Sequence, residues 1–266
     1  MSDFHPETVA LITGAASGIG LAIANRLLSD GITNLSLLDL PSPSLSALPE
    51  ALTKNFPAAR ILALPTDVSQ ERDISSAISL TVAEFHRIDL SVHAAGIGGH
   101  GMVMDETSAM EKMVAVNLMG VWLCESMVVK QMLLQEERSL TTGLPYKTRG
   151  SIVNIGSLCG LSAARPAGAT YVMTKHGVVG MTKADARDYG PKGIRINCIC
   201  PGWIKTGMTA GLDTSGFTDQ IISRVPLARW GASEEVAYLA SFLLSDKASF
   251  ITGSSYTVDG GLSVTV

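Results

Sequence analysis

Charged side chains are scarce in this sequence of 266 residues: Asp, Glu, Lys and Arg together make up 17%, and the net charge is −4. Lysines and arginines are scattered along the chain, so no basic excess is available to hold a polyanionic backbone. We therefore expect no nucleic-acid partner. Hydrophobic residues, in contrast, make up 46%, which is typical of a globular protein with a sizeable core.

Cysteine is rare, and long apolar runs are absent. The four cysteines show no paired CxxC spacing, and Cys198 and Cys200 lie in a strand-like run where small buried thiols are common. The opening residues, MSDFHPETVALITG, contain an acidic residue and an early proline instead of the basic segment and apolar run of a signal peptide. No uninterrupted apolar stretch has the length needed to span a bilayer. We expect a cytoplasmic protein with reduced cysteines, no metal and no membrane partner.

The apolar runs that do occur are short, rich in Val, Ile and Leu, and alternate with longer segments of helical periodicity. This alternation predicts buried parallel strands joined by helices. The predicted strands lie near 7–13, 33–39, 60–66, 88–95, 150–156, 193–200 and 255–258. The predicted helices lie near 18–29, 47–56, 70–86, 105–137 with a break, 169–189 and 233–245. The sequence therefore predicts an α/β fold, a Rossmann-like doubly wound parallel sheet of about seven strands, in a single domain over 1–266.

Two segments depart from the βα alternation. Residues 136–149 (EERSLTTGLPYKTR) are polar and contain Gly143 and Pro145, so they are predicted to form an exposed loop. Residues 202–230 follow the sixth predicted strand and are long for a connection in a compact domain. Such a length predicts a substrate loop or lid.

A glycine-rich turn follows the first predicted strand. The strand TVALIT runs into GAASGIG, which contains Gly14, Gly18 and Gly20, and then into a helix beginning LAIANRLL. Glycine allows a tight turn and lets a pyrophosphate approach the helix N-terminus, where free N–H groups favour an anion. The spacing, GxxxGxG, differs from the GxGxxG fingerprint, and such a turn alone is a weak indication.

Acidic residues close the second and third predicted strands. Asp39 stands 19 residues after Gly20, near the expected place of an acid that hydrogen-bonds a ribose hydroxyl; the alternative is a turn-former before Pro41. Asp67, in TDVS, could accept from an adenine amine or cap the next helix, and considered alone the cap is the better interpretation. HAAG (93–96) ends the fourth strand with small residues, suited either to a ring or sugar lying against the backbone or to close helix packing.

The surroundings of Asp39 predict NAD as the cofactor in preference to NADP. A carboxylate that accepts from ribose hydroxyls repels a 2′-phosphate at the same place. A basic residue nearby could relieve this repulsion, but the glycine turn supplies only AAS (15–17) and the residues after Asp39 are LPS (40–42).

A second group of polar residues has the types needed for carbonyl chemistry. Tyr171 and Lys175, in YVMTK, are four residues apart and share one helix face. Such a pair alone is usually an exposed pair on the helix surface without a catalytic role. Ser157 ends the fifth predicted strand and Asn117 lies in the helical segment after the fourth, on the side where doubly wound sheets bind ligands. A phenol with a pKa of ~10 exchanges its proton poorly at neutral pH, and a lysine ammonium beside it, together with an oxidised nicotinamide, lowers that pKa. Ser157 is expected to hydrogen-bond the substrate oxygen.

Eight motifs together resemble the short-chain dehydrogenase/reductase family in order and spacing, over nearly the whole chain. They are TGAASGIG, Asp67-Val68, HAAG, Asn117, the IVNIGS run ending at Ser157, YVMTK, PGWIKT (201–206) and ITGSSYTVDGG (251–261). The resemblance implies an NAD-dependent oxidoreductase with a Ser157, Tyr171 and Lys175 triad, in which Asn117 helps a water relay protons to the lysine.

The motifs and the resemblance also predict the dinucleotide site, with Ile204 and Thr206 near the nicotinamide carboxamide. The predicted contacts are Gly14, Ser17, Gly18, Ile19, Gly20, Asp39, Asp67, Val68, Ala95, Gly96, Tyr171, Lys175, Pro201, Gly202, Ile204 and Thr206.

Two positions depart from the family pattern. His93 stands where the NNAG motif usually begins, so the asparagine contacts made there are missing, and we predict a structural role for it. A catalytic role for His93 is the lesser alternative, because Tyr171 already fills the base position. Gly156 stands where a second serine is common, which leaves Ser157 and the triad intact.

The predicted substrate is a fairly apolar alcohol or ketone. The pocket walls are expected from 97–104, 158–166 and 203–227, which supply Met102, Met104, Trp203 and Met208 but few charges; these residues could equally belong to the core. Arg165 could meet an anionic group or an interface. The alternatives are a 3-oxoacyl thioester reductase, a non-catalytic dinucleotide sensor or scaffold, and a sugar-nucleotide epimerase, which usually has a larger carboxyl-terminal domain.

Large apolar residues on the long helical segment predict a homo-oligomer, a tetramer or dimer built on the helices with Asn117 and Tyr171. These residues are Val121, Trp122, Met127, Val128 and Met132, more apolar surface than one sheet face should need.

Overall fold

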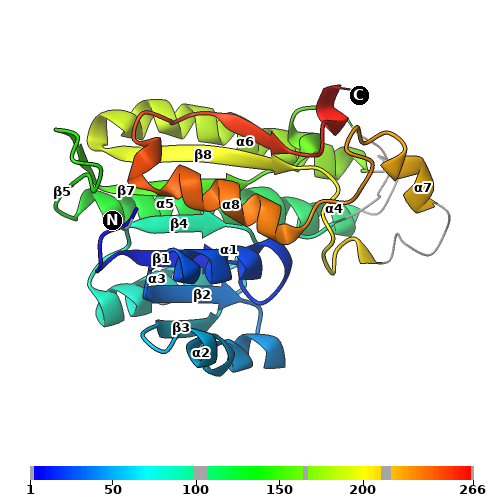
Figure 1. The fold of residues 1–266 in the computed structure, drawn as a ribbon. Helices are drawn as coiled ribbons and strands as arrows, with labels where there is room; N and C mark the ends of the chain where they lie inside the picture. Colours follow the sequence, from blue (N-terminus) through cyan, green and yellow to red (C-terminus); the bar gives the residue numbers. More distant parts are fainter. Residues whose placement is uncertain (1–2, 99–106, 164–166, 211–216, 265–266) are drawn as a thin grey trace.

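The computed structural model describes residues 3–98, 107–163, 167–210 and 217–264, and the predicted doubly wound sheet is confirmed within them (Figure 1). The main sheet of this described part has seven parallel strands in the order β3-β2-β1-β4-β7-β8-β9. The strands are β1 (Val9–Thr13), β2 (Asn34–Asp39), β3 (Arg60–Pro65), β4 (Leu90–His93), β7 (Gly150–Ile155), β8 (Ile194–Pro201) and β9 (Ser255–Val258). Each lies within two residues of its predicted bounds.

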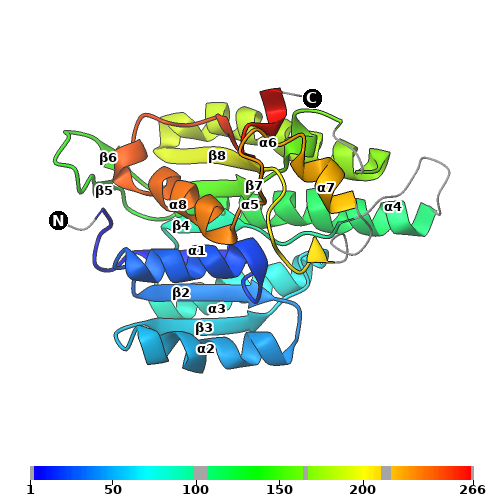
Figure 2. The same cartoon turned by 45° about the vertical axis from the view of Figure 1, so that its right-hand side comes forward.

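Helices cover both faces of the sheet (Figures 1 and 2). One face carries α1 (Gly18–Ser29), α2 (Pro43–Asn55) and α8 (Ser233–Leu244), and the other carries α3 (Glu71–Phe85), α5 (Gly120–Leu133) and α6 (Ala169–Tyr189). Strand β1 is buried on both faces, which explains why its sequence is almost entirely apolar. Ala10 and Ile12 pack into the first core and Leu11 into the second, since successive side chains of a strand point to opposite faces.

The order of the strands reverses between β1 and β4, and the candidate site lies at the carboxyl ends of these two strands. Strands β2 and β3 lie on one side of β1, while β4 and β7 lie on the other. Such a reversal of strand order is where doubly wound sheets bind ligands, in a crevice at the carboxyl edge. The Thr13 hydroxyl, at the end of β1, accepts hydrogen bonds from Ala94 N and Ala95 N at 3.1 and 3.2 Å.

The predicted break in the long helical segment is a π-helical turn. Helix α4 (Thr107–Val114) continues through Ala115–Met119, which is π-helical, into α5. A π-helical turn widens the helix locally and is frequent at functional sites, and this one carries Asn117. Of the described helices, the run Thr107–Leu133 alone is long and apolar enough, by length and composition, to cross a membrane. Packing explains much of this apolar character, because Val128 and Met132 are fully buried.

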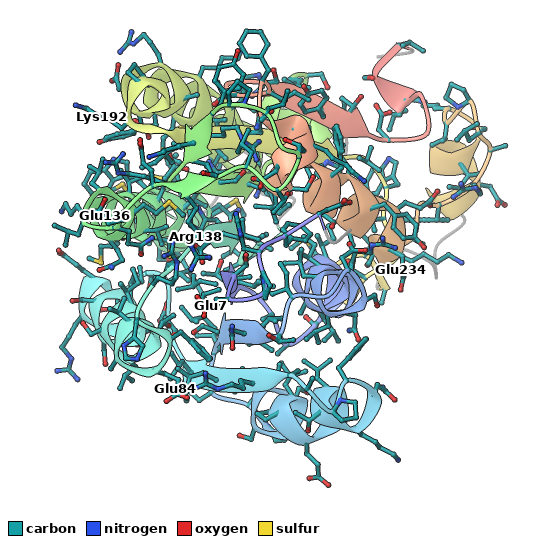
Figure 3. All side chains as sticks on the ribbon, turned by 60° about the vertical axis from the view of Figure 1, so that its left-hand side comes forward. Glu7, Glu84, Glu136, Arg138, Lys192 and Glu234 are labelled. Carbon is teal, nitrogen blue, oxygen red and sulfur yellow. The ribbon has the colours of Figure 1, made fainter. Side chains whose placement is uncertain are left out.

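The segment 136–149, predicted as an exposed loop, contains a short antiparallel hairpin. Its strands are β5 (Arg138–Ser139) and β6 (Lys147–Thr148), too short to leave a pattern in the sequence. Arg138 is mostly covered: its guanidinium lies 3.6 Å from Asp89, which precedes the central strand β4, and 3.7 Å from Glu7, which is labelled close to it in Figure 3. The second departing segment, 202–230, holds α7 (Phe217–Ile222) among its described residues.

Candidate active site

The glycine turn after β1 is packed so closely that side chains have no room. A Cβ atom at Gly14, whose φ is +67°, would lie 2.7 Å from Ala95 N, and one at Gly20 would lie 2.2 Å from Gly14 O. The turn thus brings the backbone ends of β1 and β4 together at the N-terminus of α1. Free N–H groups at such an end, without side chains over them, suit a phosphate.

A cavity of about 750 Å³ opens beside this turn, and most of the predicted dinucleotide residues line it. From that prediction the lining includes Gly14, Ser17, Gly18, Ile19, Gly20, Asp39, Asp67, Val68, Ala95, Gly96 and Thr206. Thr206 approaches the turn from the other side, since its methyl group would lie 3.3 Å from a Cβ atom at Gly18.

The other predicted cofactor residues, which are Pro201, Gly202, Ile204, Tyr171 and Lys175, are not among the residues that line this cavity. Pro201 is buried at the end of β8, and Gly202 N donates to Val258 O at 3.0 Å. Ile204 is only 4% exposed and packs in the core near Gly231.

Asp39 faces the cavity from the end of β2. One carboxylate oxygen accepts from Ala16 N in the glycine turn at 2.8 Å, and the other accepts from Leu40 N at 2.7 Å. Both sequence interpretations of this residue therefore have a basis in the structure: the carboxylate shapes a local turn, and it lies on the wall of the cavity.

Asp67 shapes a local turn as well. Its carboxylate accepts from Ser69 N at 2.9 Å and from the Ser69 hydroxyl at 2.7 Å, while α3 begins only at Glu71. The residue therefore stabilises the turn two residues ahead of it and does not cap the helix directly. It also lines the cavity, so the adenine contact predicted from the sequence stays available.

The predicted triad comes together from β7 and α6. The Ser157 hydroxyl, at the carboxyl end of β7, is hydrogen-bonded to the Tyr171 side chain and also accepts from Cys159 N at 3.1 Å. Lys175 Nζ lies 5.8 Å from the centroid of the Tyr171 ring and donates to Ile155 O at 2.9 Å. Spacing of four residues on one helix explains how Tyr171 and Lys175 share a face.

Asn117 fixes the loop that follows β4. Its amide oxygen accepts from Ile97 N at 2.8 Å, and its amide nitrogen donates to Ile97 O at 2.9 Å. The Asn117 side chain is fully buried, and a Cβ atom at Gly96 would lie 3.3 Å from its oxygen and 3.8 Å from Lys175 Nζ. Sequence reasoning did not predict this clamp, although an asparagine in the apolar run AVNLM signals a buried amide that needs partners.

Comparison with known proteins agrees with this geometry. Residues 14–263 match the family model described as Enoyl-(Acyl carrier protein) reductase. The chain belongs to the short-chain dehydrogenase/reductase family. Levodione reductase of Leifsonia aquatica is 37% identical over 97% of this chain and 94% of its own length. For 2-(R)-hydroxypropyl-CoM dehydrogenase of Xanthobacter autotrophicus the identity is 36%, over 95% of this chain and 97% of the relative.

Similarity extends to the three-dimensional fold. The solved crystal structure of levodione reductase superposes with a TM-score of 0.88 at 34% identity, over 99% of this chain and all of the other. As a member of this family, the protein is an oxidoreductase that acts on CH–OH groups and uses a nicotinamide dinucleotide.

Burial controls the proton affinity of the two ionisable triad residues of this dehydrogenase. It raises the pKa of Tyr171 to about 12, against the smaller lowering by the hydrogen bond from Ser157. It also lowers the pKa of Lys175. The sequence predicts a lowered Tyr171 pKa from Lys175 together with an oxidised nicotinamide; the protein's own groups leave this pKa raised, because burial removes hydration from the phenolate.

His93 belongs to a buried polar network beneath the site. One ring nitrogen lies 2.7 Å from Asn154 Oδ1 and the other 3.0 Å from the Ser91 hydroxyl. Asn154 in turn donates to Glu125 Oε2 at 2.5 Å. Burial lowers the pKa of His93 to about 4, so the ring is neutral at physiological pH. This geometry agrees with the structural role predicted for His93.

A group of apolar side chains lies on the segments that follow β7 and β8. Trp203 packs against Leu158, Val225 and Leu262, and its ring meets Trp230 edge to face with centroids 5.7 Å apart. Met208 is half-exposed and close to Gly98. Three residues singled out for this region, Met102, Met104 and Arg165, lie outside the described residues.

Proposed function

We propose that this protein is an NAD(H)-dependent enzyme that interconverts a ketone and a secondary alcohol on a fairly apolar small molecule. The observation that carries the proposal is the assembly of Ser157, Tyr171 and Lys175 beside a glycine-bounded cavity whose far wall holds Asp39. The bound dinucleotide would supply or accept the hydride at the substrate carbon. The remaining steps concern the oxygen, and they fall to side chains of this chain.

Tyr171 is the proposed proton-transfer residue. In reduction its hydroxyl gives a proton to the oxygen that gains charge as the carbon is reduced, and in oxidation the phenolate takes that proton back. Ser157 is suited to orient the same oxygen, because Cys159 N holds its hydroxyl beside the Tyr171 side chain, where the O–H can turn from Tyr171 to the substrate oxygen. Lys175 is held toward Tyr171 by Ile155 O, where its ammonium favours the phenolate.

The residues present fit a dinucleotide. The cavity of about 750 Å³ is bounded by the closely packed glycine turn, where the N-terminus of α1 suits a pyrophosphate. The side chains of Ile19 and Val68 offer apolar contacts, and Thr206 offers a hydroxyl near the same turn. Asn117 would keep Ile97 and the loop after β4 in place under the ring.

Asp39 supports NAD over NADP. A 2′-phosphate would approach a carboxylate that already accepts two backbone N–H groups, in a partly closed cavity. Two like charges ~4 Å apart at an effective dielectric near 20 repel by about 4 kcal/mol, and a fraction of this gives about a tenfold preference or more.

A screen of ketones and secondary alcohols, read by NADH absorbance at saturating cofactor, tests the function. We expect turnover of apolar cyclic or open-chain substrates, with kcat/KM at least about tenfold higher for NAD(H) than for NADP(H) at fixed ionic strength. Equal values, or a preference for NADP, would mean that Asp39 does not face the ribose.

A 3-oxoacyl thioester reductase is the second candidate, favoured by the 33% identity of this chain to a protein of Staphylococcus epidermidis named 3-oxoacyl-[acyl-carrier-protein] reductase. The same screen separates the two, because a thioester reductase should prefer 3-oxoacyl thioesters to simple ketones. A non-catalytic sensor is less well supported, since such a protein would typically lack Tyr171 or Lys175 and both are present.

Assembly into a homo-oligomer in the cytoplasm remains part of the proposal, although fewer residues support it than the sequence suggested. Val121, Val128 and Met132 are buried in the core, and Met127 packs partly against it. Trp122 is 47% exposed and remains available to a partner. Light scattering that gives only the monomer mass across the micromolar range would refute the oligomer.

A further inference from the structure

The chain forms a tight turn directly after β9. The Asp259 carboxylate accepts from Gly261 N at 2.9 Å and from Ser263 N at 2.7 Å, and these two hydrogen bonds hold the turn closed. Gly260 and Gly261 have φ values of +63° and +89°, a backbone conformation that residues with a side chain rarely adopt. The sequence VDGGLS therefore fixes the path of the chain beyond β9 and buries Leu262, which is only 3% exposed.

This C-terminal turn fastens the downstream end of the predicted substrate loop, 202–230. Leu227 N donates to Gly260 O at 3.1 Å. A Cβ atom at Gly260 would lie only 2.7 Å from Val225 Cγ1, so the loop packs directly against the backbone of the turn. In Figures 1 and 2 the C-terminal residues, in red, accordingly lie beside the segment that leads away from α7.

The upstream end of the loop meets the same turn. A Cβ atom at Gly202 would lie 2.7 Å from Asp259 Cβ. Gly231 N also donates to Trp203 O at 2.9 Å, which joins the two ends of the loop to each other. Both ends of the loop therefore share one base, built on the C-terminal turn. Fixing the two ends reduces the conformational entropy that ordering the loop over a ligand would cost.

Leu262 links this base to the turn that carries Ser157. The side chains of Leu158, Val225 and Leu262 are at most 4% exposed and pack as one group. Leu158 follows Ser157 directly, and Cys159 N, one residue further, donates to the Ser157 hydroxyl at 3.1 Å. Packing of the Leu158 side chain therefore fixes the turn from which the Ser157 hydroxyl points.

We propose that Leu262 is a positioning residue that aligns the Ser157 hydroxyl with the base of the substrate loop. The inference rests on the proposed function and deepens it. Leu262 acts through the group that it forms with Leu158 and Val225, and it takes no part in bond breaking. Ser157 orients the substrate oxygen and the loop covers the rest of the substrate, so an error in their relative placement slows the reaction. A misplacement of about 1 Å can cost about a hundredfold in rate.

Leu262→Ala in the full chain tests the proposal. The truncation leaves a cavity in the packed group, so both the Ser157 turn and the base of the loop gain freedom. We expect kcat/KM to fall by about tenfold or more. NAD affinity should stay within about twofold, because Leu158, Val225 and Leu262 do not line the dinucleotide cavity. Leu262→Met, which nearly conserves the side-chain volume, should restore most of the activity.

Leu243→Ala is the matched control that separates alignment from stability. Leu243 lies on α8, is fully buried in the first core and does not belong to the packed group. Its truncation should lower thermal stability at least as much as Leu262→Ala does. Its kcat/KM should nevertheless stay within about twofold of the native value at a temperature where both variants are folded. Equal losses of kcat/KM in the two variants would assign Leu262 a role in stability alone and overturn the proposal.

A double-mutant cycle with Ser157→Ala identifies the route of the effect. Once the hydroxyl is absent, Leu262→Ala should lower kcat/KM by less than about threefold, compared with about tenfold in the native background. Additive losses would overturn the proposal, and Leu262→Val replaces Leu262→Ala in the cycle if the alanine variant does not fold. Absence of turnover of every ketone and secondary alcohol by the native protein would instead overturn the proposed function, so the two failures are distinguishable.

Discussion

The dinucleotide end and the catalytic end of this site are built by different means. At the dinucleotide end, backbone meets backbone: Gly14 and Ala95 approach so closely that a single methyl group would collide. At the catalytic end, side chains from α6, the π-helical turn and the segment after β7 are held in place by hydrogen bonds. Binding a phosphate requires backbone N–H groups in a fixed turn. Proton transfer instead requires side chains whose surroundings set their pKa. Variants can test whether the two ends are as separable as this contrast indicates.

The largest expected effect belongs to Tyr171→Phe. Removing the hydroxyl deletes the proposed proton-transfer group while the ring still packs, so kcat/KM should fall by about two to four orders of magnitude. NAD affinity, measured by quenching of protein fluorescence, should stay within about twofold of the native value, since the glycine turn is untouched. Tyr189→Phe, on the same helix, is the matched control. A Tyr171→Phe variant that retains more than about a tenth of the native kcat/KM would remove Tyr171 from the mechanism.

Lys175→Met should impair both NAD binding and proton transfer, because the family resemblance places this lysine on the nicotinamide ribose as well as beside Tyr171. We expect kcat/KM to fall by about a hundredfold or more and NAD binding to weaken too. Lys183→Met removes an exposed lysine two turns further along α6 and should change neither quantity. Unchanged NAD affinity in Lys175→Met would count against the dual role.

The same contrast explains what could be predicted from the sequence. Strands such as VALIT are continuous apolar runs because helices cover both faces, so their number and bounds were predicted within two residues. The glycine turn and the triad were predicted because their chemistry requires particular residue types at fixed spacing. The β5–β6 hairpin was missed because strands of two residues have no periodicity. The raised pKa of Tyr171 was missed because burial depends on residues far apart in the chain.

Exchange of Asp39 for Ser tests the dinucleotide end alone. The carboxylate accepts from Ala16 N and faces the cavity, so its loss should weaken NAD and narrow the preference over NADP by about tenfold. Turnover at saturating NAD should stay close to native, because Tyr171 and Lys175 are unchanged. Adding Leu40→Arg supplies the missing cation and should reverse the preference. An undiminished NAD preference in Asp39→Ser would show that another group selects the cofactor.

His93 makes the unfolding free energy depend on pH, and it lies beneath the site, outside both the dinucleotide end and the catalytic end. Its folded-state pKa is about 4, below the ordinary value of 6.5, because burial disfavours the charged ring. A base whose folded pKa is lowered contributes its full stability above pH 6.5 and loses it as the pH falls toward 4. Between pH 7 and 5 the loss amounts to about 2 kcal/mol of unfolding free energy.

His93→Asn, which introduces the residue usual in this family, should remove this pH dependence. Urea unfolding at pH 7 and pH 5 measures it: the native protein should lose about 2 kcal/mol more than the variant over this range. Glu125 shares the network, and burial raises its pKa, so its contribution has the opposite sign and is lost as the pH rises through the folded-state value. Both proteins keep Glu125, so the difference between them reports the His93 contribution together with its coupling to Glu125. Equal losses in the two proteins would mean that His93 is protonated in the folded state, in which case the Glu125 carboxylate 4.0 Å away has become its partner.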